Sequence, residues 1–411
     1  DANNREVNEM QVPNIEIGKT TIGSLVDVLA DDFGEKRALA YHSHGIDCNF
    51  KEFRTICDDV AKGLMGLGIE KGEHIAIWAN NVPEWVFMQY GSARAGAVMV
   101  TVNTSYRSFE LEYLMQQSDA TTLIMIGGVR EADEYIKVVK ELVPDLDTTE
   151  PGKINCENLP EFKRIVYIGE DELKGAFSWQ DMLDAGKCVP DSDLKARMDS
   201  LEPDDVVNMQ YTSGTTGFPK GVMLTHTNLL GNAKSMGECM RLSTADTMCI
   251  PVPFFHCFGC VIGTLCCMVS GSTMAPVVAF TAKDVMETID REKATVILGV
   301  PTMFIAELEE MEHKNYDTSH LRTGVMAGSP CPIEVMKAVV DKMGASEMTI
   351  VYGQTEASPG ITQTRVDDSL ELRVTTVGRA LPGVEVKIID DDGNELPPGE
   401  QGELCSRGYN T

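Results

Sequence analysis

The chain contains 411 residues, of which 43% are hydrophobic and 24% are charged. This length suggests two or three compact units. The hydrophobic content excludes both an intrinsically disordered chain and a small scaffold held together by disulfides. The formal net charge at pH 7 is −28. Because so acidic a surface repels the phosphate backbone of nucleic acids, we expect no nucleic-acid partner.

The cysteines indicate a reducing compartment. Twelve are scattered along the chain, and several stand in apolar runs such as Cys260 to Cys267, which is typical of buried thiols in a cytosolic protein. The first residues show no basic segment followed by an apolar one, so no secretory signal is expected. We therefore expect a cytoplasmic protein.

One stretch has to be considered as a membrane segment. Residues 247–282 contain no Asp, Glu, Lys or Arg, but prolines and glycines divide them. The longest helix expected there, 258–270, is shorter than the roughly 20 residues that span a bilayer. The stretch is interpreted as two buried strands that flank a buried helix, and no integral membrane span is expected.

From about residue 70, short continuous apolar runs alternate with amphipathic segments. We predict strands at 74–79, 97–102, 121–126 and 164–168, and helices at 83–94 and 130–142. Continuous apolar runs are typical of parallel strands that are covered on both faces. Residues 143–160 and 169–200 are polar and contain prolines, so they are interpreted as surface loops and a linker.

The pattern restarts near Asp204. We predict strands at 206–211, 247–252, 294–300, 324–327 and 348–351, with helices at 228–240, 258–270, 301–312 and 333–343. This indicates a second β/α unit. After Glu356, alternating runs at 384–389 and 402–406 flank the turn at 391–394, which predicts an antiparallel hairpin.

The strongest local signal is the run from Tyr211 to Gly221. Its hydroxyl and glycine residues offer backbone N–H groups and hydroxyls to a polyphosphate, and Lys220 adds a positive charge. The run contains Thr212, Ser213, Gly214, Thr215, Thr216 and Gly217. It is not a Walker A loop, because Pro-Lys-Gly stands where Gly-Lys-Ser/Thr is needed. The glycines at 66–72 do not match a dinucleotide-binding fingerprint either. The alternative for the run is a flexible surface turn.

Several motifs resemble those of the acyl-adenylate-forming, or AMP-binding, enzymes, and in particular their acyl-CoA synthetase branch, which includes fatty-acid–CoA ligases. Residues 212–221 match the phosphate loop of that family, 352–356 its Tyr-Gly-x-Thr-Glu motif and 253–259 its Pro-x-x-His-x-x-Gly segment. Residues 327–330, 378–383 and 399–404 resemble further motifs. The resemblance extends from about residue 20 to the end of the chain.

The resemblance implies an α/β fold with two stacked β/α sandwich subdomains, followed by a smaller antiparallel, β-barrel-like subdomain. We assign them to residues 1–200, 201–351 and 352–411, and expect the residues before about 70 to pack elsewhere. The family ends in a small C-terminal domain that carries a catalytic lysine. No match to it follows the stretch 402–411, so we expect this chain to be the large N-terminal part, with its last subdomain truncated.

The resemblance also implies a reaction. A carboxylic acid and ATP form acyl-AMP and pyrophosphate, and the acyl group then passes to coenzyme A. Because two anions must be joined, catalysis has to neutralise charge on the phosphates. By resemblance, Lys220, His256, Thr355 and Glu356 are the catalytic candidates.

The expected nucleotide site follows from the same motifs. The loop 212–217 with Lys220 would hold the β- and γ-phosphates, and Thr355 the α-phosphate. Glu356 and Thr216 would hold Mg²⁺, a cation that prefers oxygen ligands. The adenine is expected to stack on Tyr352 beside the turn that contains Gly328 and Ser329. Taken alone, Glu356 would be interpreted as a solvated surface carboxylate.

His256 has two further interpretations. On an apolar segment, a lone histidine is more often a core residue than a catalytic one. With Cys257, Cys260 and the pair Cys266-Cys267, it could also form a zinc site, but the spacing fits a closed tetrahedral site poorly. The resemblance instead places His256 near the substrate carboxylate.

The acid is expected to bind Phe255, His256, Val300, Gly328 and Gly353. Acetate-specific relatives carry Trp where Gly353 stands, so Gly353 is expected to leave room for a longer tail. Residues 253–259 contain no carboxylate that could pair with a substrate amine. A medium-chain fatty acid is therefore expected. An aryl-acid CoA ligase, a module that loads a carrier protein, and a non-catalytic nucleotide-binding protein are the alternatives, and a homo-oligomer is left open.

Overall fold

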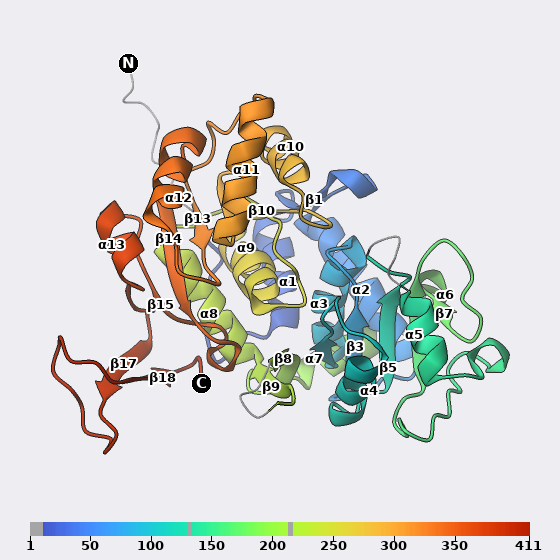
Figure 1. Cartoon of the computed structure of the whole chain (residues 1–411). Helices are drawn as coiled ribbons and strands as arrows, with labels where there is room; N and C mark the ends of the chain where they lie inside the picture. The colour runs from blue at the N-terminus through green and yellow to red at the C-terminus, as the bar shows by residue number, and fades with distance from the viewer. Residues whose placement is uncertain (1–10, 130–133, 213–216) are drawn as a thin grey trace.

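The computed structural model describes residues 11–129, 134–212 and 217–411, and contains two large β-sheets with helices between and around them (Figure 1). The first sheet has the strand order β7-β6-β5-β3-β4-β8-β9. All neighbours are parallel except β8 and β9. The strands are β3 (His74–Trp78), β4 (Val98–Thr101), β5 (Thr122–Ile126), β6 (Arg164–Ile168), β7 (Phe177–Ser178), β8 (Val206–Thr212) and β9 (Lys220–Thr225).

The second sheet has the order β16-β15-β14-β13-β12-β10-β11-β1-β2. Its centre is parallel, and antiparallel strands complete both edges. The strands are β1 (Arg37–Tyr41), β2 (Ile46–Asn49), β10 (Thr247–Ile250), β11 (Thr273–Pro276), β12 (Val296–Gly299), β13 (Thr323–Met326), β14 (Glu347–Gly353), β15 (Gly360–Gln363) and β16 (Arg379–Ala380).

Helices that are buried on most sides join the two sheets into one core. They are α3 (Pro83–Ala95), α8 (His226–Cys239), the π-helix η3 (Phe258–Leu265) and α9 (Cys266–Ser270), flanked by α1 (Ile22–Phe33) and α2 (Phe50–Gly66). Pro83 begins α3 because a proline needs no N–H partner in the first turn, and Gly96 ends it in the left-handed conformation at φ 73°. The expected buried helix at 258–270 is thus confirmed, with a π-helical first half.

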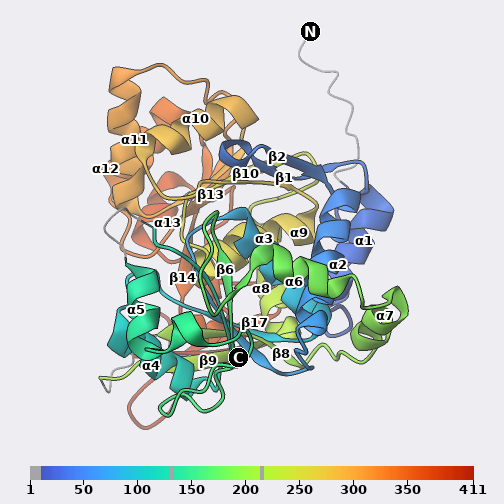
Figure 2. The ribbon, with the colours of Figure 1, turned by 90° about the vertical axis from the view of Figure 1, so that its right-hand side faces the viewer.

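Other helices cover the outer faces (Figure 2). A second apolar cluster lies under α10 (Ala282–Glu292), α11 (Pro301–His313), α12 (Ile333–Ala338) and η4 (Val339–Met343) on the second sheet. The first sheet carries α4 (Ser108–Gln117), α5 (Tyr135–Leu142), α6 (Trp179–Gly186) and α7 (Asp191–Asp199). Shorter elements are η1 (His42–His44), η2 (Leu146–Thr148), η5 (Thr355–Ala357) and α13 (Leu370–Thr375).

The strands β17 (Val384–Ile389) and β18 (Glu403–Gly408) pair antiparallel as a separate two-stranded sheet. The hairpin predicted from their alternating pattern is therefore confirmed. The α/β class with a small antiparallel sheet is confirmed as well. Within the described residues, no helix is both long and apolar enough to cross a bilayer.

One expectation differs from the structure. Residues 169–200 are not simply a loop and linker, because they contain β7, α6 and α7. The polar sequence hid α7, which buries only Leu194. Strands β8 and β9 complete the first sheet, and β1 and β2, which precede residue 70, extend the second. The subdomain boundaries stay a prediction.

Candidate active site

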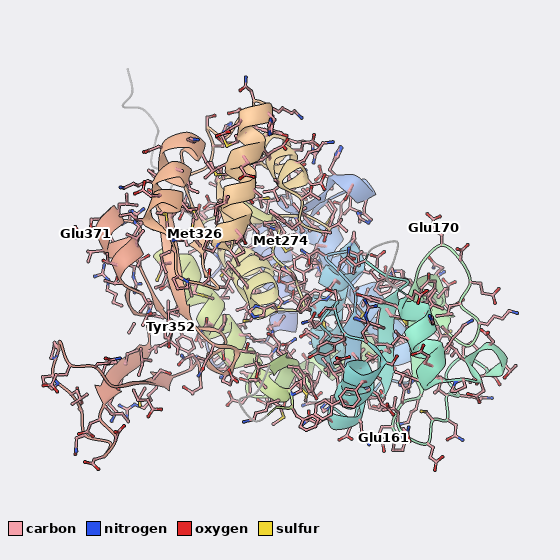
Figure 3. The ribbon with its side chains drawn as sticks, in the orientation of Figure 1. Glu161, Glu170, Met274, Met326, Tyr352 and Glu371 are labelled. Carbon is pink, nitrogen blue, oxygen red and sulfur yellow. The ribbon has the colours of Figure 1, made fainter. Side chains whose placement is uncertain are left out.

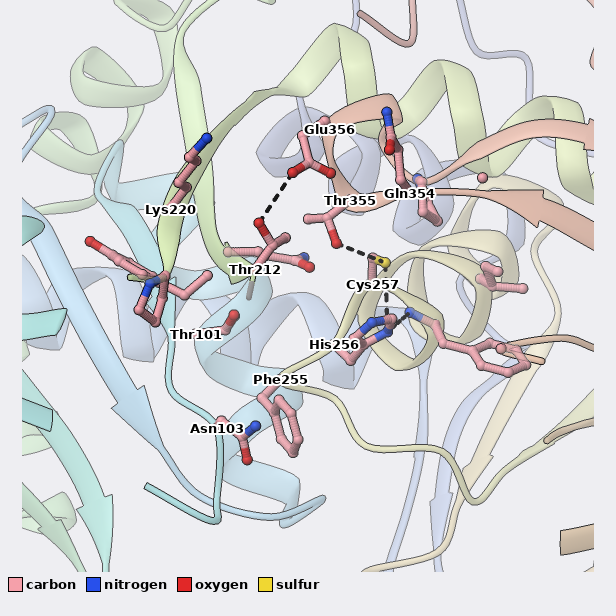
Figure 4. Close-up of a pocket in the computed structure, with 18 of the residues that line it drawn as sticks. Thr101, Asn103, Thr212, Lys220, Phe255, His256, Cys257, Gln354, Thr355 and Glu356 are labelled. Atoms are coloured by element: carbon pink, nitrogen blue, oxygen red, sulfur yellow. Dashed lines mark hydrogen bonds between the residues drawn. The ribbon is translucent and has the colours of Figure 1, made fainter. Parts of the chain in front are cut away.

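A cavity of about 810 Å³ lies where the carboxyl ends of strands from both sheets meet (Figure 4). β4 and β8 contribute from the first sheet, and β13 and β14 contribute from the second. Open α/β sheets bind ligands at this edge, because loops that follow parallel strands gather there. The segment after β10 closes the cavity with Phe255, His256 and Cys257.

The structure brings together many of the residues expected from the sequence. Those that line the cavity are Thr212, Lys220, Phe255, His256, Gly328, Gly353, Thr355 and Glu356. Gly217 is described, with φ 96°, but does not line the cavity. The phosphate-loop residues Ser213, Gly214, Thr215 and Thr216 lie outside the described residues, so their roles stay predictions.

One side of the cavity carries exposed charge. The Thr212 hydroxyl donates to the Glu356 carboxylate at 3.1 Å and so connects the ends of β8 and β14. Lys220 stands opposite Thr212 in the β8–β9 register. In the described part of the chain, Lys220 forms no ion pair with a carboxylate. Its charge therefore remains free to meet an anion.

The oxygen atoms on this side suit a hard cation. Glu356 offers a carboxylate at the cavity, and the Thr212 hydroxyl lies beside it. Mg²⁺ is usually bound by one or two carboxylates together with substrate phosphates, because it dehydrates reluctantly. The donor set therefore fits Mg²⁺, with Glu356 as the protein ligand that the described residues supply.

A series of contacts between uncharged groups runs from Thr355 to His256 on the other side of the cavity. Thr355 is 8% exposed, and its hydroxyl lies 3.9 Å from the Cys257 sulfur. That sulfur lies 3.6 Å from Nδ1 of His256. Burial raises the pKa of the Cys257 thiol to about 12, so Cys257 is uncharged at neutral pH. Cys257 therefore connects the two motifs as a neutral spacer.

The protonation of His256 follows from its neighbours. The backbone N–H of Phe258 donates to Nδ1 at 3.1 Å, so Nδ1 is an acceptor and the proton of the neutral ring sits on Nε2. The ring can be reached from the open cavity, yet the protein around it removes water and lowers its pKa. At neutral pH, His256 is therefore a hydrogen-bond donor at Nε2.

Besides Gly217, three expected residues lie outside the cavity lining. Tyr352 is 43% exposed, and Figure 3 shows it at the second sheet on the side of the β17–β18 hairpin. Ser329 is exposed. Val300 lies behind Gly328, because its Cγ1 would be 3.1 Å from a Cβ added to that glycine. The roles of Tyr352 and Ser329 beside adenine and of Val300 beside the acid stay predictions.

The interpretation of Gly353 needs a correction. Gly353 lines the cavity, but a Cβ added to it would lie 1.9 Å from the carbonyl oxygen of Pro359. The missing side chain would therefore point at β15 and not into an acyl tunnel. Gly353 allows the close approach of β14 and β15, where it pairs with Gly360. Any substitution there has to move the backbone.

Several lining residues were missed by the sequence reasoning. They are Thr101, Asn103, Tyr106, Gln210, Ile262, Val351 and Pro359. Six further lining residues stand in the recognised motifs but had no assigned role there: Tyr211, Pro219, Cys257, Phe258, Ala327 and Gln354. A signal existed for some of them, because Thr101, Asn103 and Gln210 stand at or just after the ends of predicted parallel strands. The apolar members gave no signal, because cavity-lining and core positions look alike in sequence.

Comparisons with known proteins agree with this geometry. A profile of the family described as AMP-binding enzyme matches residues 27–411. YngI of Bacillus subtilis (strain 168), whose name gives acyl-CoA synthetase as its expected activity, is 52% identical over 395 residues. The mitochondrial medium-chain acyl-CoA ligase ACSF2 of Mus musculus is 34% identical over 399 residues. The chain spans 72% of the length of YngI and 64% of the mouse ligase, and the two alignments cover 96% and 95% of this chain.

Solved structures show the same fold. A long-chain-fatty-acid-CoA ligase, FadD1 of Archaeoglobus fulgidus, superposes with a TM-score of 0.80 at 26% identity, covering 98% of this chain and 77% of that one. The anthranilate CoA ligase AuaEII, solved with anthranoyl-AMP, gives a TM-score of 0.80 at 24% identity, covering 96% and 71%. The second likeness bears on the fold alone.

Proposed function

Because the chain belongs to the AMP-binding enzyme family, in its acyl-CoA synthetase branch, we propose that it activates a carboxylic acid with ATP. The acid oxygen attacks the α-phosphorus, pyrophosphate leaves, and the acyl group of the resulting acyl-AMP passes to coenzyme A. The observation that carries this proposal is the meeting of Lys220, Glu356, Thr355 and His256 around one cavity. These are the charges and donors that the joining of two anions requires.

Each side of the cavity would do one part of this work. Lys220 would offset the charge of the phosphates as pyrophosphate leaves, and Thr355 would donate from its hydroxyl to the α-phosphate. Glu356 would hold Mg²⁺, which would supply further positive charge on the same side. His256 donates from Nε2 to an oxygen of the acid, which orients the other oxygen for attack. Because the Phe258 N–H occupies Nδ1, His256 acts as a donor and not as a base.

We propose a medium-chain fatty acid as the substrate. Phe255, Phe258, Ile262 and Val351 give the cavity an apolar wall, and each buried methylene contributes about 0.8 kcal/mol to binding. Among the described lining residues, Glu356 is the only carboxylate. We assign it to the phosphate side, so no carboxylate next to His256 would pair with a substrate amine. The mouse relative is named as a medium-chain ligase, which favours this class.

We further propose that the protein works in the cytoplasm. All twelve cysteines are free, and most are buried. Thiols of this kind persist where glutathione keeps them reduced.

The test is acid-dependent exchange of labelled pyrophosphate into ATP, run on the protein at its natural length. The panel contains acetate, octanoate, palmitate, benzoate and leucine. The proposal predicts the fastest exchange with octanoate and none with leucine. Exchange only with leucine, or with none of the acids, would contradict it. Fastest exchange with benzoate would keep the reaction and replace the fatty acid by an aryl acid.

A further inference from the structure

Asn81 is a buried asparagine that lies beside the acid side of the cavity without lining it. It is 2% exposed and follows β3 of the first sheet. Its Oδ1 accepts the backbone N–H of Phe254 at 2.9 Å. Its Nδ2 donates to the carbonyl oxygens of Val252 and Val277, both at 3.0 Å. Both polar groups of the amide therefore form hydrogen bonds to the backbone that follows β10 and β11 of the second sheet.

Asn232 repeats this arrangement on the phosphate side. It lies in α8 and is completely buried. Its Oδ1 accepts the backbone N–H of Gly360 at 2.8 Å. Its Nδ2 donates to the carbonyl oxygens of Ala357 at 3.2 Å and Gly360 at 3.0 Å. A Cβ added to Gly360 would be 3.0 Å from Oδ1, so the glycine permits this close contact.

Each asparagine holds a segment that carries one half of the site. Val252 and Phe254 come just before Phe255 and His256, which would meet the acid. Ala357 and Gly360 come just after Thr355 and Glu356, which would meet the nucleotide and Mg²⁺. The hydrogen bonds of the two asparagine side chains share no backbone group. We propose that Asn81 and Asn232 are positioning residues, the first for the acid side and the second for the phosphate side.

Asparagine suits this task because its amide both donates and accepts. Aspartate has the same shape but no donor when ionised, so it would place an anion against two carbonyl oxygens. The segment held by Asn81 contains Pro251 and Pro253, which have no backbone N–H. The N–H of Phe254, which directly follows Pro253, is thus one of few backbone donors by which this segment can be fixed.

Asn81 is also anchored through its own backbone. Its N–H donates to the carbonyl of Val278 at 3.2 Å, and the Tyr41 hydroxyl donates to its carbonyl. Phe254, whose N–H it holds, packs its ring against Trp85 with the centroids 5.1 Å apart. The segment before His256 is therefore held from both sheets at once. A shift of Asn81 would therefore displace the His256 imidazole through Phe254 and Phe255, the two residues before it.

Asn208 offers a matched control. It is also buried, at 5% exposed, but its Nδ2 makes one bond, to the carbonyl of Met99 at 3.2 Å. Its Oδ1 has no partner within the described residues, and Asn208 does not line the cavity. An aspartate there removes a buried donor and contacts neither the segment held by Asn81 nor the segment held by Asn232.

The inference rests on the proposed function, and a crossed experiment tests it. Asn81→Asp, Asn232→Asp and Asn208→Asp are made in the protein at its natural length, and pyrophosphate exchange gives KM for octanoate and for ATP. We expect Asn81→Asp to raise KM for octanoate about tenfold or more, with KM for ATP within about twofold. Asn232→Asp should raise KM for ATP about tenfold or more and leave KM for octanoate within about twofold. Asn208→Asp should lower Tm and leave both KM values unchanged.

Equal rises of both KM values in Asn81→Asp and Asn232→Asp would overturn the inference, because a merely structural role predicts that result. Unchanged values would overturn it as well. If the aspartate variants do not fold, Asn81→Ser and Asn232→Ser carry the same test, since a hydroxyl keeps one donor and one acceptor.

Amide hydrogen exchange gives a second reading that does not depend on activity. Asn81→Asp should speed exchange in residues 252–257 and leave 357–361 unchanged, and Asn232→Asp should do the opposite. Equal acceleration in both segments would again overturn the inference. A wild-type protein that exchanges no pyrophosphate with octanoate would contradict the proposed substrate, while the hydrogen-exchange pattern still decides the role of the two asparagines.

Discussion

The two sides of the cavity are built in opposite ways. On the phosphate side, Lys220 and Glu356 are exposed and charged. On the acid side, His256 and Cys257 are held neutral by the loss of water around them. Charge serves the side where charge must be offset, and neutral donors serve the side where an acid must be oriented. The following predictions test this division.

The largest effect is expected on the phosphate side. Glu356→Gln keeps the size and removes the charge, so the adenylation half-reaction should fall about a hundredfold or more. Tm should change little, because Glu356 is exposed and its side chain contacts Thr212 at the cavity. Pyrophosphate exchange measured over a range of Mg²⁺ concentrations checks this. A rate equal to the wild type at low Mg²⁺ would remove Glu356 from the metal site.

A somewhat smaller effect is expected from His256. His256→Ala should lower kcat/KM for the acid about 10- to 100-fold, as expected for a hydrogen bond to a charged group. His256→Gln should restore part of this loss, because its amide can still donate. If the glutamine variant is as slow as the alanine variant, the imidazole acts as a base and not as a donor.

The pH profile sharpens the same point. Loss of water lowers the pKa of His256, so the ring stays neutral in the folded protein at pH values where a free imidazole already binds a proton. As pH falls, kcat/KM for the acid should therefore hold below about pH 6.5, the ordinary value for histidine, and drop only at the lower pKa. A loss of kcat/KM that already sets in above about pH 6.5 would contradict the proposal that His256 is a neutral hydrogen-bond donor.

Lys220 should affect the nucleotide and not the acid. Lys220→Met removes the charge but keeps most of the side-chain length, so KM for ATP should rise about tenfold, a change of about 1.4 kcal/mol. KM for octanoate should stay within about twofold. Equal changes in both would mean that Lys220 shapes the whole cavity rather than its phosphate side.

The smallest effect on activity is expected from a residue away from the cavity, which serves as a control. Glu307 in α11 is fully buried, both carboxylate oxygens lack a partner within the described residues, and burial raises its pKa to about 8. Between about pH 5 and 8, the unfolded chain loses the proton that the folded chain keeps, so stability falls as pH rises. Between these pH values, the free energy of unfolding of Glu307→Gln should fall by about 2 kcal/mol less than that of the wild type, or by a still smaller amount. KM values should stay unchanged. Urea unfolding at several pH values measures the free energies.

The resemblance to a known family predicted the charged residues of the site, because the motifs that carry the resemblance contain Lys220 and Glu356. The run around Lys220 and the motif that ends in Glu356 each fit within about ten residues, so a single sequence reveals them. Most of the parallel strands were also predicted, since burial on two faces leaves continuous apolar runs, but β1 and β7 were not. The fold class followed from the alternation of these runs with amphipathic segments.

Long-range contacts could not be predicted in the same way. Asn81 bonds to Val252, which is 171 residues away, and neither residue carries a local signal of that contact. Cys257 could be interpreted as a metal ligand or as a core residue until its place between His256 and Thr355 was known. Gly353 lines the cavity, but its missing side chain was expected to point into an acyl tunnel and instead points at β15, because the approach of β15 depends on tertiary pairing.

The most direct test of the account follows the oxygen of the acid. Octanoate labelled with ¹⁸O in its carboxylate is incubated with the protein at its natural length, ATP, Mg²⁺ and coenzyme A, and the products are examined by mass spectrometry. If the carboxylate attacks the α-phosphorus beside Lys220 and Glu356, AMP carries one ¹⁸O atom and pyrophosphate carries none. Label in inorganic phosphate, with ADP as the nucleotide product, would show attack on the γ-phosphorus and contradict the account.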